Sequence, residues 1–201
     1  MRKKISIIDY GVGNYASLHG MFNRLNCLSS VTNNIKEIKN SDLIILPGVG
    51  TFKTAIKKLR KDKIDKLLKI MAKEGKFILG ICLGMQLLTS SSTEDGFEKG
   101  LNIIPGNILR IKNNKHNIGW SSLKILKKEN FLKNTDFKNE YYFQHGYFYQ
   151  GLDKFKLAKS SNFPEVTGII KLNNSIGVQF HPEKSQNSGE NFVLNILNKI
   201  K

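Results

Sequence analysis

Apolar runs of strand length recur through the first half of the chain. Four such segments are separated by polar and amphipathic stretches. They are Ile5 to Asp9, Ser29 to Thr32, Asp42 to Leu46 and Phe77 to Ile81. A strand in a parallel sheet is covered on both faces and therefore has a nearly continuous apolar sequence. These segments predict the parallel centre of a buried sheet.

Helices are predicted between and after these strands. Helical periodicity occurs in three segments, namely Ala16 to Leu25, Thr54 to Ala72 and Glu190 to Ile200. In the second segment, apolar residues recur at mixed spacings of three and four, namely Ala55, Ile56, Leu59, Ile64, Leu67, Leu68 and Met71. Strands that alternate with helices predict a parallel sheet with right-handed crossovers.

The second half of the chain is richer in strand signals. We expect a polar loop from Ser90 to Gly100, followed by two short strands with a bend in Leu101 to Arg110, one aromatic strand from Tyr141 to Tyr149, and strands at Leu157 to Lys159, Thr167 to Leu172 and Ile176 to Phe180. We predict one domain over residues 1–201. Its fold class is α/β, a three-layer sandwich of flavodoxin-like type, with antiparallel strands added to a mostly parallel central sheet.

Composition places the chain among soluble globular proteins, with 40% hydrophobic and 24% charged residues. No apolar run approaches the length that crosses a bilayer. The basic start, Met1 to Ile5, leads directly into a strand and has no signal-peptide core. We therefore expect a cytoplasmic protein that makes no membrane contact.

The net charge of +16 raises the question of a nucleic-acid partner. The lysines are spread through helices and loops, so we interpret the charge as a compositional bias and expect no nucleic-acid binding. A basic face of this kind suits an acidic protein partner or a phosphorylated substrate.

Cys82 occupies a turn with the pattern of a nucleophile elbow. Phe77 to Ile81 predicts a buried strand, a helix is expected from Met85, and Gly80 and Gly84 flank the cysteine at two residues on either side. The glycines allow a strained turn and close backbone approach. The start of a helix favours a thiolate, and the amide of Leu83 is suited to stabilise an oxyanion.

A cysteine nucleophile needs a base, and the base needs a group that orients it. Near the end of the chain, the strand ending at Phe180 runs into a loop with His181 and Glu183, which supply both. The alternative is a cysteine that only packs as a small apolar residue, as we expect for Cys27. His145 is a second candidate base, but no acidic residue lies near it in sequence.

Two motifs resemble those of class I (triad) glutamine amidotransferases. They are Gly80-Ile81-Cys82-Leu83-Gly84-Met85-Gln86 and Gln179-Phe180-His181-Pro182-Glu183-Lys184-Ser185. The segments Ile8 to Asn14 and Leu46 to Phe52 narrow the resemblance to glutaminase subunits of imidazole glycerol phosphate synthases. It covers essentially the whole chain. It implies a Cys82–His181–Glu183 triad that hydrolyses glutamine to glutamate and ammonia.

The resemblance also implies roles for other residues. An oxyanion hole is implied at Leu83, Gly48, Val49 and Gly50, glutamine binding at Gln86, Tyr142, Phe143, Gln144 and His145, and a partner interface at Asn14, Trp120 and Lys184. The implied partner is a (β/α)8-barrel cyclase that receives ammonia and makes imidazole glycerol phosphate and an aminoimidazole carboxamide ribotide for histidine biosynthesis.

Neither a metal nor an organic cofactor is expected. No cysteine belongs to a cluster with metal-ligand spacing, and Gly11 and Gly13 lack the third glycine and the later acidic residue of a dinucleotide site.

Two stretches depart from the family pattern and leave other functions open, and the resemblance places both near the glutamine pocket or the partner face. His116 to Ser121 replaces a Pro-His-Met-Gly-Trp-Asn sequence, and Gly146 stands where the family's aromatic strand has a serine. One alternative is a related glutaminase that supplies ammonia to amidate a surface or flagellar sugar. The others are a scaffold subunit without turnover, against which the intact triad argues, and a cysteine hydrolase of γ-glutamyl peptides.

Overall fold

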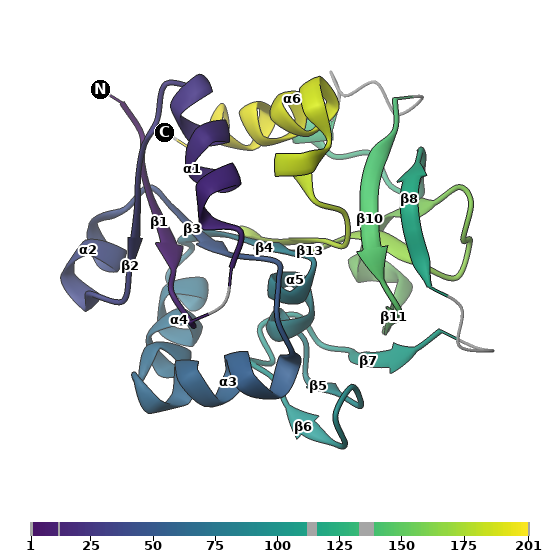
Figure 1. Cartoon of the computed structure of the whole chain (residues 1–201), viewed down its shortest axis with the longest axis horizontal. Helices are drawn as coiled ribbons and strands as arrows, with labels where there is room; N and C mark the ends of the chain where they lie inside the picture. The colour runs from purple at the N-terminus through teal and green to yellow at the C-terminus, as the bar shows by residue number, and fades with distance from the viewer. Residues whose placement is uncertain (1, 12, 112–115, 133–138, 201) are drawn as a thin grey trace.

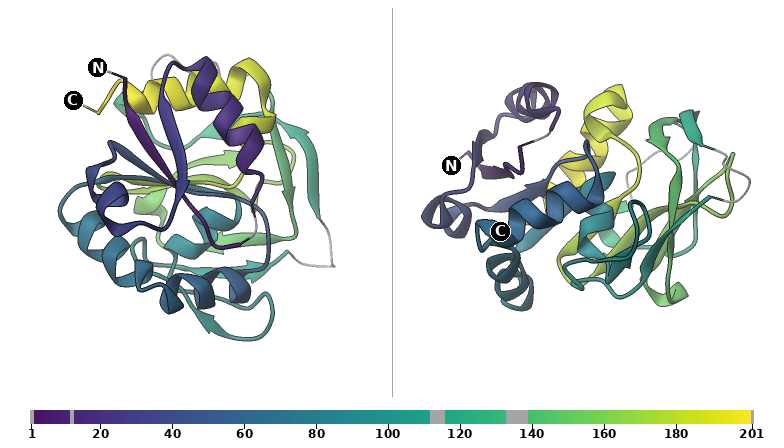
Figure 2. Two further views of the ribbon diagram at one scale, coloured as in Figure 1. Left: turned by 60° about the vertical axis from the view of Figure 1, so that its left-hand side comes forward. Right: turned by 60° about the horizontal axis from the view of Figure 1, so that its bottom comes forward.

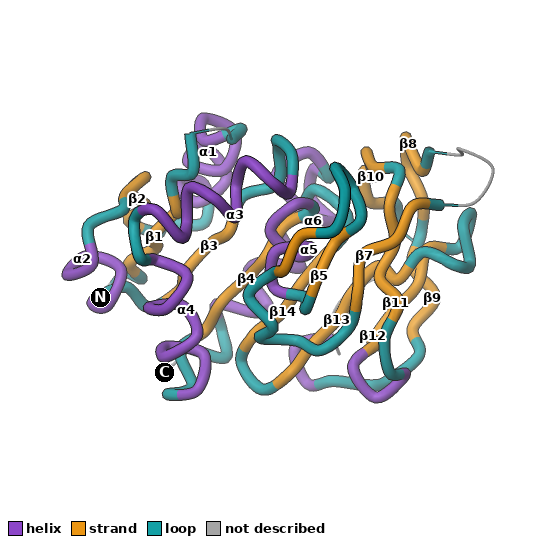
Figure 3. The backbone as a smooth tube through the Cα atoms, turned by 90° about the horizontal axis from the view of Figure 1, so that it is seen from below, coloured by secondary structure: helices purple, strands orange, loops and turns teal. Residues whose placement is uncertain are grey.

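The computed structural model of the chain describes residues 2–11, 13–111, 116–132 and 139–200. Its centre is an eight-stranded sheet in the order β2-β1-β3-β4-β14-β13-β12-β9 (Figure 3). Five strands are parallel, namely β2 (Leu28–Thr32), β1 (Lys4–Ile8), β3 (Leu43–Leu46), β4 (Phe77–Ile81) and β14 (Ser175–Val178). The antiparallel strands are β13 (Thr167–Leu172), β12 (Lys156–Ser160) and β9 (Leu123–Ile125). The predicted α/β class and the antiparallel extension of a mostly parallel sheet are confirmed.

Helices cover both faces of the parallel half of the sheet (Figures 1 and 2). One face carries α1 (Tyr15–Arg24) and α6 (Gln186–Leu197), and the other carries α3 (Phe52–Lys61), α4 (Ile64–Lys73) and α5 (Leu83–Leu88). Alternate residues of each strand divide between two apolar cores, since Leu43 and Ile45 face the first layer while Ile44 and Leu46 face the second. This period of two explains why the central strands are apolar throughout.

Two smaller β structures flank the antiparallel half. A ribbon joins β8 (Asn117–Ser121) to β10 (Tyr141–His145), and a four-stranded sheet has the order β11-β7-β5-β6. Its strands are β11 (Tyr147–Gln150), β7 (Asn107–Arg110), β5 (Ser91–Ser92) and β6 (Glu98–Lys99). The predicted single strand from Tyr141 to Tyr149 was wrong, because the chain changes sheets at Gly146.

The single helix predicted from Thr54 to Ala72 was also wrong. Lys63 takes a left-handed conformation with φ of 60° and separates α3 from α4. Leu59 and Ile64 are both fully buried. At a spacing of five they would point about 140° apart on a continuous helix, so the break lets both reach one core.

Three further differences concern short elements. The helix α2 (Ile35–Asn40) was not predicted, although Asn34 caps it by accepting bonds from the amides of Lys36 and Glu37. Part of the expected Ser90–Gly100 loop forms β5 and β6. Only β7 forms in the Leu101–Arg110 stretch, where two strands were expected, because the amides of residues 101–104 bond instead to carbonyls at the end of α5.

Among the described helices, none combines the length and the apolar character needed to cross a bilayer.

The turn between β4 and α5 depends on close backbone packing. A Cβ on Gly84 would collide with the carbonyl oxygen of Leu46 in β3, and one on Gly80 would lie 2.6 Å from the carbonyl carbon of Gly84. Both glycines are therefore required by space, as the sequence pattern suggested.

Replacing Gly84 by alanine should destabilise the fold by about 1–3 kcal/mol, because the added methyl group would overlap the backbone of Leu46. The free energy of unfolding from urea denaturation measures this loss. Gly20→Ala is the matched control, since a Cβ there meets nothing closer than the flexible Arg24 guanidinium at 3.4 Å. Equal stability of Gly84→Ala and the parent would contradict the packing argument.

Candidate active site

Cys82 forms the turn between β4 and α5 in a strained conformation. Its φ of 46° and ψ of −102° are disfavoured for a residue with a side chain, and its amide donates to the carbonyl of Val178 at 2.7 Å. Strain of this kind persists only where the surrounding structure enforces it. Here the packing of Gly80 and Gly84 holds the turn, so the sulfur lies at the first turn of α5.

The cysteine sulfur is buried, with the residue 5% exposed. The amide nitrogen Nε2 of Gln179 donates to it at 3.6 Å, and the carbonyl of Gln144 lies 3.9 Å away. Its neighbours therefore come from the end of β14 and from β10, which are far apart in sequence.

His181 follows β14 and is held by bonds to its backbone. Its amide donates to Tyr142 at 2.8 Å, and its carbonyl accepts from the hydroxyl of Ser185 at 2.6 Å. The Nδ1 atom of its ring lies 2.8 Å from Oε1 of Glu183, and both side chains are 2% exposed. The carboxylate thus fixes the ring and leaves Nε2 to face the cysteine.

Burial of His181 disfavours the imidazolium, but this is outweighed by the charge of Cys82, by its hydrogen bond to the ring, and by the bond and charge of Glu183. Together they raise the pKa of His181 to about 10. The site therefore favours a charged histidine beside the sulfur, which is the state in which a cysteine acts as a nucleophile.

A cavity of about 350 Å³ opens beside this pair. Ten of the predicted site residues line it: Gly48, Val49, Gly50, Cys82, Leu83, Gln86, Gln144, His145, His181 and Lys184. The Pro47–Gly50 loop lies close to the histidine, since a Cβ on Gly48 would lie 2.9 Å from Cε1 of His181. The buried hydroxyl of Tyr10 donates to the carbonyl of Pro47 and anchors the start of this loop.

The other predicted site residues lie outside the cavity wall. Phe143 is fully buried in the core against Phe180. Trp120 and Tyr142 pack edge to face, with ring centroids 5.7 Å apart, and Lys184 lies over the Tyr142 ring. Glu183 lies behind His181, and Asn14 caps α1 without a side-chain bond.

Four further residues line the cavity: Glu94, His116, Gly146 and Tyr147. The last three belong to stretches that the resemblance placed near the glutamine pocket or the partner face, whereas Glu94 had no such signal. Glu94 accepts a bond from the amide of Phe52 at 2.8 Å, and burial raises its pKa. It follows the short strand β5 in a polar, glycine-containing stretch, so no local pattern marked it.

His145 differs from His181 in its partners. Its Nδ1 donates to the carbonyl of Tyr147 at 2.6 Å, while Nε2 is buried and has no bond to any described residue. The pKa of His145 is lowered to about 3, mainly by burial. The charges of His181 and His116 lower it further, whereas the bond to Tyr147 raises it. His145 is therefore a neutral group beside a charged one.

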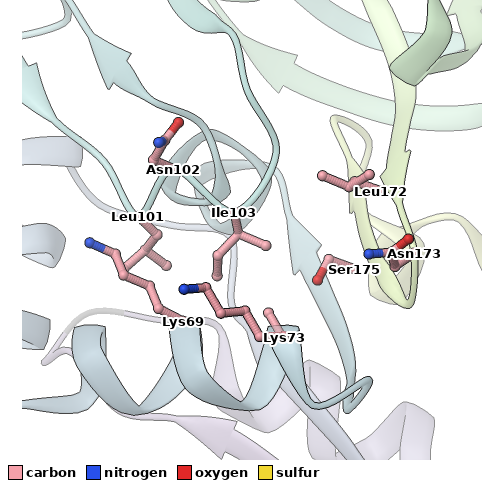
Figure 4. Close-up of a pocket in the computed structure, with 9 residues that line it drawn as sticks. Lys69, Lys73, Leu101, Asn102, Ile103, Leu172, Asn173 and Ser175 are labelled. Atoms are coloured by element: carbon pink, nitrogen blue, oxygen red, sulfur yellow. The ribbon is translucent and has the colours of Figure 1, made fainter.

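A second cavity of about 350 Å³ lies at the opposite edge of the sheet, between α4 and the turn after β13 (Figure 4). Lys69, Lys73, Asn102 and Asn173 contribute its polar groups, and Leu101, Ile103 and Leu172 are among its apolar residues. None of the described residues that line it is a cysteine, a histidine or an acidic residue. No group of three or more His, Cys, Asp or Glu side chains in the described part of the chain is arranged to hold a metal.

The fold and the site define a class of protein, the α/β proteins with a nucleophile elbow. Residues 6–198 match the family described as glutamine amidotransferase class-I. Similar solved structures include PurLQS from Thermotoga maritima, with a TM-score of 0.79, 19% identity and 100% of both chains covered, and a glutamine amidotransferase from the same organism, with a TM-score of 0.71, 14% identity and 100% and 98% covered.

Among named relatives is the imidazole glycerol phosphate synthase subunit HisH of Caldanaerobacter subterraneus, 41% identical over 98% of both chains. The Archaeoglobus fulgidus subunit HisH is 37% identical over 98% of this chain and 99% of its own. The chain therefore belongs to the class I glutamine amidotransferases and, within them, to the HisH family of glutaminase subunits. It is an enzyme subunit.

The low pKa of His145 gives a prediction for acid stability. The unfolded chain protonates this residue below about pH 6.5, whereas the folded chain keeps it neutral down to about pH 3. The free energy of unfolding should therefore decrease as the pH is lowered through that window. This group contributes up to about 1.4 kcal/mol per pH unit to the decrease. Urea denaturation between pH 7 and about pH 5 measures the slope.

The variant His145→Gln cannot take up this proton, so its stability should fall less steeply over the same range. The comparison uses the slopes and not the absolute stabilities, because the substitution itself changes packing. Parallel slopes for the two proteins would contradict a neutral, buried His145.

Proposed function

We propose that this chain is the glutaminase subunit of an imidazole glycerol phosphate synthase and that it hydrolyses glutamine to glutamate and ammonia for histidine biosynthesis. The observation that carries the proposal is a strained, buried cysteine that lines one cavity with a histidine, the Nδ1 atom of which is bound to a buried carboxylate. The family and the named relatives support the substrate and the pathway.

In the first step, the Cys82 thiolate attacks the carboxamide carbon of glutamine. The oxygen gains negative charge, which the Leu83 amide at the start of α5 and an amide of the Gly48–Gly50 loop stabilise. His181 then gives a proton to the amide nitrogen, the carbon–nitrogen bond breaks, and ammonia leaves a glutamyl thioester.

In the second step, water attacks the thioester. His181 now takes a proton from the water, the carbon–sulfur bond breaks, and glutamate leaves as the thiolate and the imidazolium are restored. Glu183 holds the ring in one orientation and stabilises its charge in both steps.

Substrate binding uses the remaining cavity wall. Glu94 is the one carboxylate among the described residues that line the cavity, so we assign it to the α-ammonium group of glutamine. Gln86 and Gln144 offer amide groups, and His145 offers a neutral Nε2. Tyr142 and Phe143 act indirectly, since both lie outside the cavity wall.

The partner binds next to this cavity. The outer side of the β8–β10 ribbon, which we call the ribbon face, consists of Ile118, Trp120, Tyr142 and Gln144 together with the adjacent Lys184. Ile118 and Trp120 are 62% and 39% exposed, which is unusual for large apolar side chains. We propose that a (β/α)8-barrel cyclase docks here and near Asn14, and that ammonia passes to it through an enclosed path.

A second candidate function follows from the names of two relatives, which carry copy numbers. Relatives are named HisH 2 in Vibrio vulnificus and HisH 1 in Campylobacter jejuni, at 40% and 34% identity. A copy of this kind is the setting for a glutaminase that supplies ammonia to amidate a surface or flagellar sugar. Its chemistry at Cys82 would be the same, and only the partner would differ.

The triad predicts a graded loss of glutaminase activity. Cys82→Ala and His181→Asn should each lower kcat by at least about 10⁴-fold, and Glu183→Gln by about 10²–10⁴-fold, because the last variant retains the base but loses its orientation. Glutamate release from glutamine is measured alone and with the cyclase subunit of the same organism and its phosphoribosyl substrate. Cys27→Ala is the control, since this buried thiol lies apart from the cavity.

Strong stimulation by the cyclase and its substrate would support the histidine pathway. A glutaminase indifferent to them would favour the sugar-amidating alternative. A protein that releases no glutamate under either condition would overturn the proposed function.

Substitutions on the ribbon face should weaken docking while leaving the active site intact. Trp120→Ala should raise the Kd for the cyclase by about 30-fold, as expected when a central aromatic anchor is removed. Calorimetric titration measures the Kd. Leu28→Ala is the control, because this residue is 50% exposed on the edge strand β2, at the other end of the sheet. Equal effects of the two variants would rule out the ribbon face.

A further inference from the structure

A buried side-chain amide beside the nucleophile has no part in the mechanism above. Gln179 follows β14, is fully buried, and is not among the described residues that line the active-site cavity. Its Nε2 donates to the Cys82 sulfur at 3.6 Å, and its Oε1 has no hydrogen-bond partner among the described residues. A buried amide with an unpaired oxygen costs stability, so packing alone does not explain this residue.

The register of the sheet places Gln179 next to Cys82. In the parallel pair of β4 and β14, Val178 lies opposite Ile81, and these two residues come next on each strand. The amide of Cys82 donates to the carbonyl of Val178 at 2.7 Å, and the amide of Gln179 donates to Gly168 in β13 at 2.9 Å. Neighbouring strands therefore fix the backbone on both sides and hold the side-chain amide beside the sulfur.

The groups around the sulfur act differently on its charge. The His181 ring forms a hydrogen bond to it and is held in its charged form. The carbonyl of Gln144, 3.9 Å away, can only accept a bond, so it favours the thiol over the thiolate. Tyr10 and His145 are neutral, since burial is the largest cause that raises the pKa of the first and lowers the pKa of the second. The N–H of Gln179 is therefore a neutral donor that favours the thiolate.

His181 cannot stabilise the sulfur in the same way throughout the reaction. It gives its proton to the leaving ammonia and takes another from water, so its ring is neutral while the thioester exists. The amide of Gln179 does not ionise and keeps its N–H at every step. Hydrogen bonds to an ionised acceptor are stronger than those to a neutral one, so this N–H gains most when the sulfur is charged.

We propose that Gln179 stabilises the Cys82 thiolate through its side-chain N–H, both before the sulfur attacks glutamine and when it leaves the thioester. The N–H is not transferred, and no covalent bond forms or breaks at the amide. The inference deepens the proposed glutaminase function and rests on it. It assigns a buried residue outside the cavity wall to the charge of the nucleophile and not to substrate binding.

The test measures thiolate formation by alkylation with iodoacetamide, in which the thiolate displaces iodide and glutamine takes no part. The chain has two cysteines, so Cys27→Ala is the parent and Cys82 is its one thiol. Gln179→Met has a similar length and no N–H. It should raise the pH of half-maximal alkylation by about one unit, because a bond to a charged group is lost. Gln179→Leu, of different shape, should give the same shift.

Glutamate release gives a second measurement of the same shift. The acidic limb of the pH dependence of kcat/KM reports the ionisation of the free enzyme. With the cyclase subunit and its phosphoribosyl substrate present, this limb should move to higher pH in both variants, by the same amount as the alkylation midpoint.

Stability separates this role from a structural one. Gln179→Met removes a buried unpaired oxygen and nearly conserves volume, so the free energy of unfolding should be unchanged or higher. Val193→Ala is the control for core packing, because Val193 is fully buried in α6. It should lower the free energy of unfolding and leave both pH midpoints where they are in the parent.

Unchanged midpoints in Gln179→Met and Gln179→Leu would overturn the proposal, and so would an equal shift in Val193→Ala. A shift in only one of the two Gln179 variants would indicate an effect of packing and would also overturn it. If the parent released no glutamate while the alkylation midpoint still shifted, the bond to the thiolate would stand and the proposed function would fail. The two failures are therefore distinguishable.

Discussion

The close backbone contact between Gly84 and Leu46 is the constraint on which the site depends. It presses the start of α5 against the end of β3, so Cys82 must turn sharply and its sulfur lies beside the loop that follows β3. That loop is anchored from the end of β1 by Tyr10 and touches His181, which follows β14. Adjacent parallel strands thus bring Cys82, the loop after β3 and His181 to one edge of the sheet, where sites in such folds form.

Two histidines in one cavity take opposite charge states because their partners differ. His181 has the Cys82 sulfur on one side and the Glu183 carboxylate on the other, and these outweigh the effect of burial. Among the described residues, the hydrogen-bond partner of the His145 ring is a backbone carbonyl, so burial prevails and the ring stays neutral. The first can exchange protons with a substrate, and the second adds no positive charge that would compete for the thiolate.

The ribbon face and the cavity share Lys184. Its ammonium group lies over the Tyr142 ring and donates to Gln144, whose carbonyl lies near the Cys82 sulfur. The amide of His181 donates to Tyr142, so one strand of the ribbon is bonded to the segment that carries the base. A partner that moves this strand by a small distance therefore acts directly on the groups around the nucleophile. This gives a physical route by which docking can change glutaminase activity.

The sequence by itself determined the central strands and the class of fold, and it predicted the chemistry of Cys82, His181 and Glu183. These follow from local features: continuous apolar runs, glycines at fixed positions, and a histidine followed two residues later by a carboxylate. Only the tertiary structure decided the break at Lys63, the change of sheet at Gly146, the membership of Glu94 in the cavity and the close approach of His116 to Gly146. Their positions result from packing between segments distant in sequence, as with Glu94 on the Phe52 amide and His116 against Gly146. Such contacts leave no periodic pattern in the chain, because each is fixed by the space that a remote segment leaves.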